Sequence, residues 1–100
     1  MHFLLCYDYA PDYAQRRGQF RDEHLRLAWE SQARGEMQLG GAVDDPLHMA
    51  VMVFRCDSSA PVEAFVAADP YVRNGIVTRW RIRRWHTVVG IEASEPTRPG

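Results

Sequence analysis

The sequence predicts an α+β domain in which four strands form one antiparallel sheet and two helices cover one of its faces. Segments rich in strand-forming residues alternate with segments of helical periodicity in the order strand, helix, strand, strand, helix, strand. Glycine, proline and aspartate separate most of these segments. A chain of 100 residues, 46% hydrophobic and 25% charged, is sufficient for one domain with one core.

The first half of the chain is expected to hold a strand, a long helix and a second strand. Residues 2–9 are too short for a helix and are rich in strand formers. Residues 12–35 show apolar side chains at three- and four-residue spacings, after an aspartate that can cap the helix and up to a glycine that can end it. Residues 36–43 predict a strand in which Gly40 and Gly41 indicate a bulge or a close backbone approach.

The second half is expected to add a strand, a helix and a last strand. Residues 44–46 supply a turn, and residues 47–56 are apolar on both faces, which predicts a central strand covered on both sides. Capping side chains then precede a helix over residues 60–68, which ends at an Asp-Pro step. Residues 76–89 are rich in β-branched and aromatic residues and predict the last strand, bent near Trp85.

This order of elements is the βαββαβ pattern of a ferredoxin-like fold. Residues 1–91 form the expected domain, and residues 92–100 are expected to be a disordered tail. Because the second face of the sheet would also carry apolar side chains, we expect a homodimer that covers this face.

Charge and hydropathy argue against two classes of partner. The net charge of −1 gives no overall attraction to nucleic acid or anionic lipid. The longest apolar run, residues 49–54, is far shorter than the ~20 residues that a membrane-spanning helix needs. Without a secretory signal, a cytoplasmic location is expected. Arg79, Arg81 and Arg83 share one strand face, but the RNP1 pattern of RNA-binding modules is missing, so a solvated or dimer-facing stripe is expected.

No motif indicates a metal, a phosphate loop or a nucleophile elbow, and no cofactor is expected. Cys6 and Cys56 lack CxxC spacing and are expected to be buried reduced thiols without an assigned role. Four histidines lack the two-His helical spacing of a zinc site: His2, His24, His48 and His86.

His24 and Asp69 are the candidates for catalysis. His24 shares a helical stripe with Phe20 and Ala28 and should point toward the sheet, and histidine is well suited to moving protons at physiological pH. Asp69 follows the second helix, which can approach the first across the sheet, so its carboxylate can orient the imidazole of a general base. The structural alternatives are a buried histidine held by one hydrogen bond, and an Asp-Pro turn in which the carboxylate binds nearby backbone amides.

Arg17, Arg21 and Tyr71 are the candidates for binding a substrate. Arg17 and Arg21 stand four residues apart, and Arg21 precedes His24 by three, so all can lie on one side of the helix. A guanidinium makes two parallel hydrogen bonds to a carboxylate, which favours a small anionic ligand. Tyr71 can donate a hydrogen bond or simply pack. The alternative for the arginines is surface ion pairing with Asp8, Asp22 or Glu23.

Three separated blocks carry a family resemblance. Residues 17–25, Arg-Gly-Gln-Phe-Arg-Asp-Glu-His-Leu, match an Arg-x-x-x-Arg-x-x-His-Leu helix. Residues 35–41, Gly-Glu-Met-Gln-Leu-Gly-Gly, match a Gly-x-aliphatic-x-x-small-Gly strand. Residues 68–72 with Gly75 match an Ala-Asp-Pro-Tyr-Val-x-x-Gly segment. In order and spacing, these blocks resemble the YCII (YciI-like) family over residues 3 to about 90.

The resemblance implies a ferredoxin-like α+β fold, a dimeric α/β-barrel-like assembly, and a site in which His24 and Asp69 form a dyad. Family members with an assigned activity transfer protons on ring substrates, as in dehydrochlorination of a chlorinated hydroxyhydroquinone, and their fold is similar to that of muconolactone isomerases. The implied function is a cofactor-independent lyase or isomerase acting on a small anionic, aromatic compound. The alternative is a non-catalytic ligand-binding or accessory dimer.

Two departures from the family pattern bear on the site. The connection between the second and third strands is short, which changes the expected pocket wall. Residues 84–86, Arg-Trp-His, replace the basic-Pro-aromatic step often found near the end of the domain, which affects the expected dimer contact or pocket rim.

Overall fold

The computed structural model describes residues 1–100, and its strands form one antiparallel sheet in the order β2-β3-β1-β4. The strands are β1 (His2–Tyr9), β2 (Met37–Val43), β3 (Met49–Arg55) and β4 (Val77–Trp85). β1 pairs with β3 on one side and with β4 on the other, and β2 continues the sheet beyond β3. This topology confirms the predicted ferredoxin-like α+β fold.

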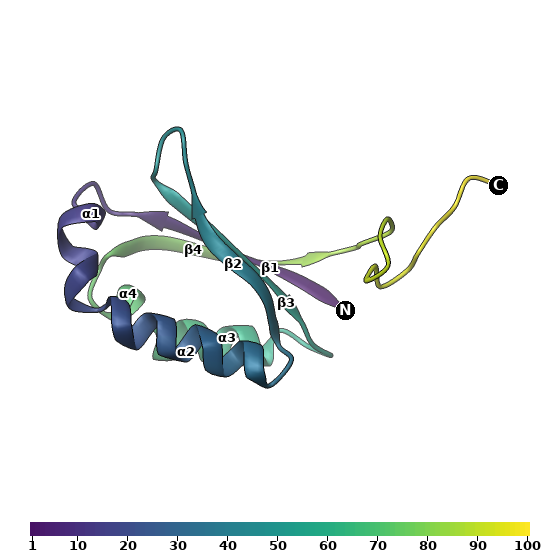
Figure 1. Ribbon diagram of the computed structural model, residues 1–100, viewed down its shortest axis with the longest axis horizontal. Helices are drawn as coiled ribbons and strands as arrows, with labels where there is room; N and C mark the ends of the chain where they lie inside the picture. Colours follow the sequence, from purple (N-terminus) through teal and green to yellow (C-terminus); the bar gives the residue numbers. More distant parts are fainter.

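The helices lie on one face of this sheet. They are α1 (Tyr13–Arg16), the 3-10 turn η1 (Arg17–Gln19), α2 (Arg21–Ala33), α3 (Ala60–Ala68) and α4 (Pro70–Arg73). Figure 1 shows α2 and α3 side by side beneath the sheet, while α1 leads into α2 at one end of this layer. The opposite face of the sheet carries no helix.

The prediction of one continuous helix over residues 12–35 is wrong. The helix is interrupted at η1, where Gly18 has low helix propensity and Phe20 takes a non-helical backbone conformation with φ −120° and ψ 0°. The side chain of Asp12 makes no capping hydrogen bond and instead lies 3.6 Å from Arg16. The break lets Tyr13 turn inward, where its buried ring stacks on Tyr9 with the centroids 3.7 Å apart.

Within the single chain, residues 47–56 are covered on one face only, and not on both as predicted. Along β3 the burial alternates, with Ala50, Met52 and Phe54 buried against the helices. The intervening side chains lie on the uncovered face and are only half-buried. An apolar run in a strand does not distinguish a helix on the second face from another protein surface there, which explains the error.

Gly40 provides the close approach that the sequence predicted in β2. A Cβ atom at this position would lie 2.9 Å from Cγ of Met52, whereas one at Gly41 would meet nothing within 4 Å. The register of β2 against β3 shifts between Met37 and Leu39, as expected for a bulge. A buried serine ties α2 to this strand, because Ser31 Oγ accepts a hydrogen bond from the backbone N–H of Met37.

The last strand ends at Trp85, earlier than the predicted Val89 and at the place where a bend was expected. Beyond it Thr87 turns inward, and its Oγ1 lies 2.7 Å from Nδ1 of the buried His2. Ser94 binds the same group, since its backbone N–H donates to Thr87 Oγ1 at 2.8 Å. Residues 92–100 contain no helix or strand, and their disorder stays a prediction. None of the helices has the length and apolar character needed to cross a membrane.

Candidate active site

The structure brings His24 and Asp69 into hydrogen-bond contact. His24 lies in the first turn of α2, and Asp69 lies between α3 and α4. The imidazole Nδ1 is 2.9 Å from Oδ1 and 3.0 Å from Oδ2 of the carboxylate. Because an ionised carboxylate only accepts hydrogen bonds, Nδ1 carries the proton in this arrangement. Nε2 makes no hydrogen bond within the chain and is the free nitrogen of the ring.

Asp69 is fully buried and has two structural tasks besides its contact with His24. It is the N-cap of α4, where Oδ1 accepts a hydrogen bond from the backbone N–H of Tyr71 at 3.0 Å. Its Oδ2 accepts a hydrogen bond from the hydroxyl of Tyr7 at 2.7 Å. The carboxylate therefore makes both contacts that the sequence suggested, since it caps a turn and also binds the imidazole, and its catalytic role stays a prediction.

Tyr7 is the residue of this cluster that the sequence analysis missed. It alternates with Phe3 and Leu5 on the inward face of β1, so it looked like an ordinary core residue. The available signal was its hydroxyl, because a tyrosine buried among apolar side chains usually requires a hydrogen-bond partner. Burial and the adjacent Asp69 carboxylate raise the pKa of Tyr7, which keeps the hydroxyl protonated as a donor.

Tyr71 supports the imidazole with its ring. The rings of His24 and Tyr71 are stacked, with the centroids 4.0 Å apart and an interplanar angle of 6°. The phenol of Tyr71 is 2% exposed and makes no hydrogen bond within the chain. Burial and the neighbouring Tyr13 raise the pKa of Tyr71. The structure therefore shows that this side chain packs against His24, and because Tyr71 also lines the cavity, its role in substrate binding stays a prediction.

Arg17 and Arg21 lie near this pair without forming the ion pairs that were the alternative for them. Arg17 donates a hydrogen bond to the Tyr13 hydroxyl at 3.3 Å, which raises the pKa of Arg17, and it meets no carboxylate. Arg21 has no carboxylate partner either, whereas Asp8 and Glu23 are engaged by other arginines, Arg81 and Arg73. The two cations are free to meet an anionic ligand.

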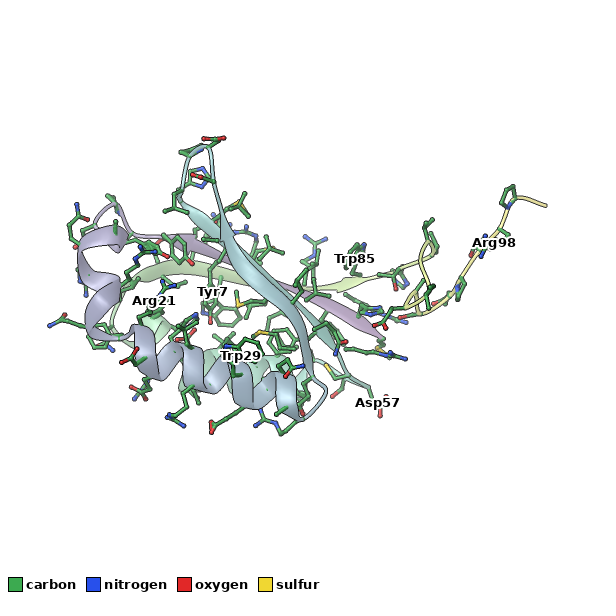
Figure 2. The ribbon with its side chains drawn as sticks, in the orientation of Figure 1. Tyr7, Arg21, Trp29, Asp57, Trp85 and Arg98 are labelled. Carbon is green, nitrogen blue, oxygen red and sulfur yellow. The ribbon has the colours of Figure 1, made fainter.

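One cavity of about 350 Å³ between α2 and the sheet is lined by Tyr7, Arg17, Arg21, His24 and Tyr71, but not by Asp69. Twelve of its nineteen lining residues are hydrophobic, so the cavity suits a ligand with an apolar body and few polar groups. Figure 2 shows Tyr7 projecting from β1 toward the helix layer, with Arg21 and Trp29 reaching toward the same space from α2. Gly40 and Met52 form part of the β2 and β3 wall.

The cavity runs along α2, with its two arginines toward α1. Near α1, the lining includes the stacked pair of Tyr9 and Tyr13, with Arg17 against Tyr13, and Arg21 at the start of α2. Further along α2 the lining includes Trp29 and Gln32, and Trp29 is 67% exposed and therefore also accessible from solvent. Along α2, His24 comes between Arg21 and Trp29, so a bound molecule with its anionic group on the arginines would pass the imidazole.

The remaining candidates lie away from this cavity. Cys6 and Cys56 are free thiols, both half-buried, and burial raises the pKa of Cys56. Arg79, Arg81 and Arg83 share the uncovered face of the sheet, as their strand positions predicted, and Arg81 is paired with Asp8 at 3.0 Å.

Comparison with known proteins identifies relatives of this fold. The sequence model of the YCII-related domain matches residues 1–86. A solved structure that is similar to this chain is the 5-chloro-2-hydroxyhydroquinone dehydrochlorinase TftG from Burkholderia phenoliruptrix AC1100, in complex with 2,5-dihydroxybenzoquinone. The TM-score is 0.73 at 23% sequence identity, with 87% of this chain and 95% of that chain covered. The comparison with curated protein sequences found no match. Because the domain model spans most of the sequence, the chain belongs to the YCII-related domain family.

Proposed function

We propose that this chain is a lyase or isomerase that transfers a proton on a small anionic, aromatic compound, with His24 as the base and without a cofactor. One observation carries the proposal. His24 has Nδ1 bound to a buried carboxylate and Nε2 free, in a cavity that also holds two arginines without carboxylate partners. A base, its orienting carboxylate and an anion-binding group are the parts that such a reaction needs.

The proton transfer follows from the hydrogen bonds of the pair. Nε2 of His24 takes a proton from a C–H or O–H bond of the ligand, and the bonding electrons stay on the ligand. The resulting imidazolium is stabilised by the Asp69 carboxylate, which keeps its charge. In an elimination these electrons expel a leaving anion, and in an isomerisation His24 returns the proton to another atom. Arg17 and Arg21 hold the anionic group during either reaction.

The similarity to TftG supports the choice of substrate class. That enzyme is named for a chlorinated hydroxyhydroquinone, and its complex contains a dihydroxybenzoquinone. Rings of this size are compatible with the cavity of about 350 Å³. Four tyrosines and a tryptophan contribute to the cavity, which favours stacking with a planar ring: Tyr7, Tyr9, Tyr13, Tyr71 and Trp29.

The test is a screen of purified protein against hydroxylated and halogenated aromatic acids, hydroquinones and quinones. Product formation is followed by absorbance and chromatography, and halide release is followed separately. For any substrate found, His24→Ala should lower kcat by roughly 10²- to 10⁴-fold. His48→Ala is the matched control, because His48 is exposed outside the cavity and its replacement should leave the rate unchanged. Full activity of His24→Ala, or ligand binding without any turnover, would contradict the proposal.

We also propose that the functional unit is a homodimer formed through the uncovered face of the sheet. This face carries half-buried Leu4, Val51 and Val53 at its centre and exposed Leu39 and Val43 on β2. A contiguous apolar surface of this kind is typical of a protein contact. Sedimentation velocity on the full chain should show a dimer at micromolar concentration, and a monomer at every concentration would contradict this part of the proposal.

A further inference from the structure

The Asp69 carboxylate is held at both oxygens by groups other than His24. The backbone N–H of Tyr71 binds Oδ1 at 3.0 Å, and the hydroxyl of Tyr7 binds Oδ2 at 2.7 Å. The Nδ1–H of His24 lies between them, 2.9 Å from Oδ1 and 3.0 Å from Oδ2. The imidazole therefore faces the middle of a carboxylate whose two ends are fixed.

The Tyr71 N–H and the Tyr7 hydroxyl differ in whether the local fold alone explains their bond to Asp69. The Tyr71 N–H belongs to the cap of α4 and would be present for structural reasons alone. The Tyr7 hydroxyl comes from β1, on the other side of the core, and makes no other hydrogen bond. Tyr7 is fully buried and lines the cavity with its ring, so phenylalanine would provide the same apolar packing there. The hydroxyl adds only the bond to Asp69.

We propose that Tyr7 is a positioning residue of the active site, whose hydroxyl fixes the Asp69 carboxylate so that His24 keeps its proton on Nδ1 and presents Nε2 to the ligand. Without this hydroxyl, Oδ2 would have His24 as its only donor, and the carboxylate could rotate about its Cβ–Cγ bond. The carboxylate would still accept from the Nδ1–H of His24, but it would be fixed at Oδ1 alone, so the imidazole would keep this orientation and tautomer for a smaller fraction of the time. The catalytic meaning of this role rests on the proposed function, but the orientation itself does not.

The experiment is ¹⁵N NMR of the His24 ring in the full chain, at a pH where the imidazole is neutral. Protonated and unprotonated ring nitrogens have well-separated ¹⁵N shifts, so the spectrum reports the tautomer without any substrate. The wild type should show the proton on Nδ1. Tyr7→Phe should lower the share of the Nδ1–H tautomer and raise that of the Nε2–H tautomer, because the carboxylate is then fixed at Oδ1 alone. An unchanged tautomer in folded Tyr7→Phe would overturn the proposal, whatever the change in stability.

Tyr71→Phe is the matched control for this measurement. It removes a hydroxyl from a second buried tyrosine that touches the imidazole, but this hydroxyl does not contact Asp69. The ring stacking and the backbone N–H remain, so the tautomer should be that of the wild type. An equal loss of the Nδ1–H tautomer in both variants would show that the effect is not specific to Tyr7 and would overturn the proposal.

A measurement on the wild type covers the case in which Tyr7→Phe fails to fold. The Tyr7 hydroxyl proton should exchange slowly with solvent and show a nuclear Overhauser effect to the Nδ1 proton of His24, because both protons lie at the same carboxylate oxygen. Absence of this contact would overturn the proposal.

If a substrate is found, Tyr7→Phe should lower kcat roughly 10-fold with little change in KM, since the hydroxyl does not bind the ligand. Failure of the substrate screen alone leaves the tautomer result unaffected, so the two proposals can fail separately.

Discussion

Replacing Gly40 with alanine tests the close contact between β2 and β3 that forms one wall of the cavity. The new Cβ atom would lie 2.9 Å from Met52 Cγ and 3.3 Å from Met37 Sδ. Met52 is 4% exposed, and Cγ is in the middle of its side chain, so it cannot move away without disturbing the core. Overpacking of this kind costs about 1–3 kcal/mol. Alanine recovers roughly 0.5–1 kcal/mol because glycine weakens a strand.

Gly41→Ala is the matched control on the same strand. Its new Cβ atom would meet nothing within 4 Å, so only the gain from removing a glycine applies. The difference in unfolding free energy between the two variants therefore isolates the overpacking cost of about 1–3 kcal/mol. For a domain of this size, each kcal/mol shifts Tm by about 4–8 °C. Urea unfolding followed by circular dichroism, at equal protein concentrations, measures the difference.

Two results would refute this reasoning. One is a Gly40→Ala variant that unfolds at the same urea concentration as Gly41→Ala. The other concerns Met52→Ala, which removes the Cγ atom that the new methyl group would meet. In that background Gly40→Ala should lose most of its cost, so a double-mutant cycle should give a favourable coupling energy. An absent coupling would show that the destabilisation arises elsewhere in β2.

Two further predictions concern buried polar groups. Asp69→Asn should lower the unfolding free energy by about 1.5–3 kcal/mol, because the imidazole loses a charged acceptor, whereas Asp57→Asn at an exposed turn should have little effect in the same urea titration. Burial, the N-terminal ammonium and Arg55 lower the pKa of His2 from 6.5, while Glu92 opposes the shift. Because the folded state favours neutral His2, the contribution of His2 to the unfolding free energy is fully present above about pH 6.5. This contribution is lost as pH falls through the pKa of His2 in the folded state. Between pH 7 and pH 5, His2→Gln should lose less stability than the wild type, and a similar loss would contradict this assignment.

Much of the candidate site could be predicted because its parts are local in the sequence. Arg21 and His24 follow helical spacing in α2, with Arg17 just before it in η1, and the Asp-Pro-Tyr step places a carboxylate where a helix ends. The family resemblance then joined these separate segments. The break at η1 was missed, because glycine and phenylalanine are each tolerated inside helices, and the packing of Tyr13 on Tyr9 that accompanies the interruption is a tertiary contact.

The sequence by itself determined the order of the strands and of the two main helices and the fold class, because hydrophobic periodicity and turn residues act over a few neighbouring positions, and its matched motifs indicated the family. The tertiary structure alone decided which groups meet. It brought Tyr7 of β1 to the far oxygen of Asp69, left Arg17 and Arg21 without carboxylates, and set Gly40 against Met52. Contacts of this kind join residues far apart in the chain, and their geometry depends on how the helices pack against the sheet. No local pattern in the sequence records that packing.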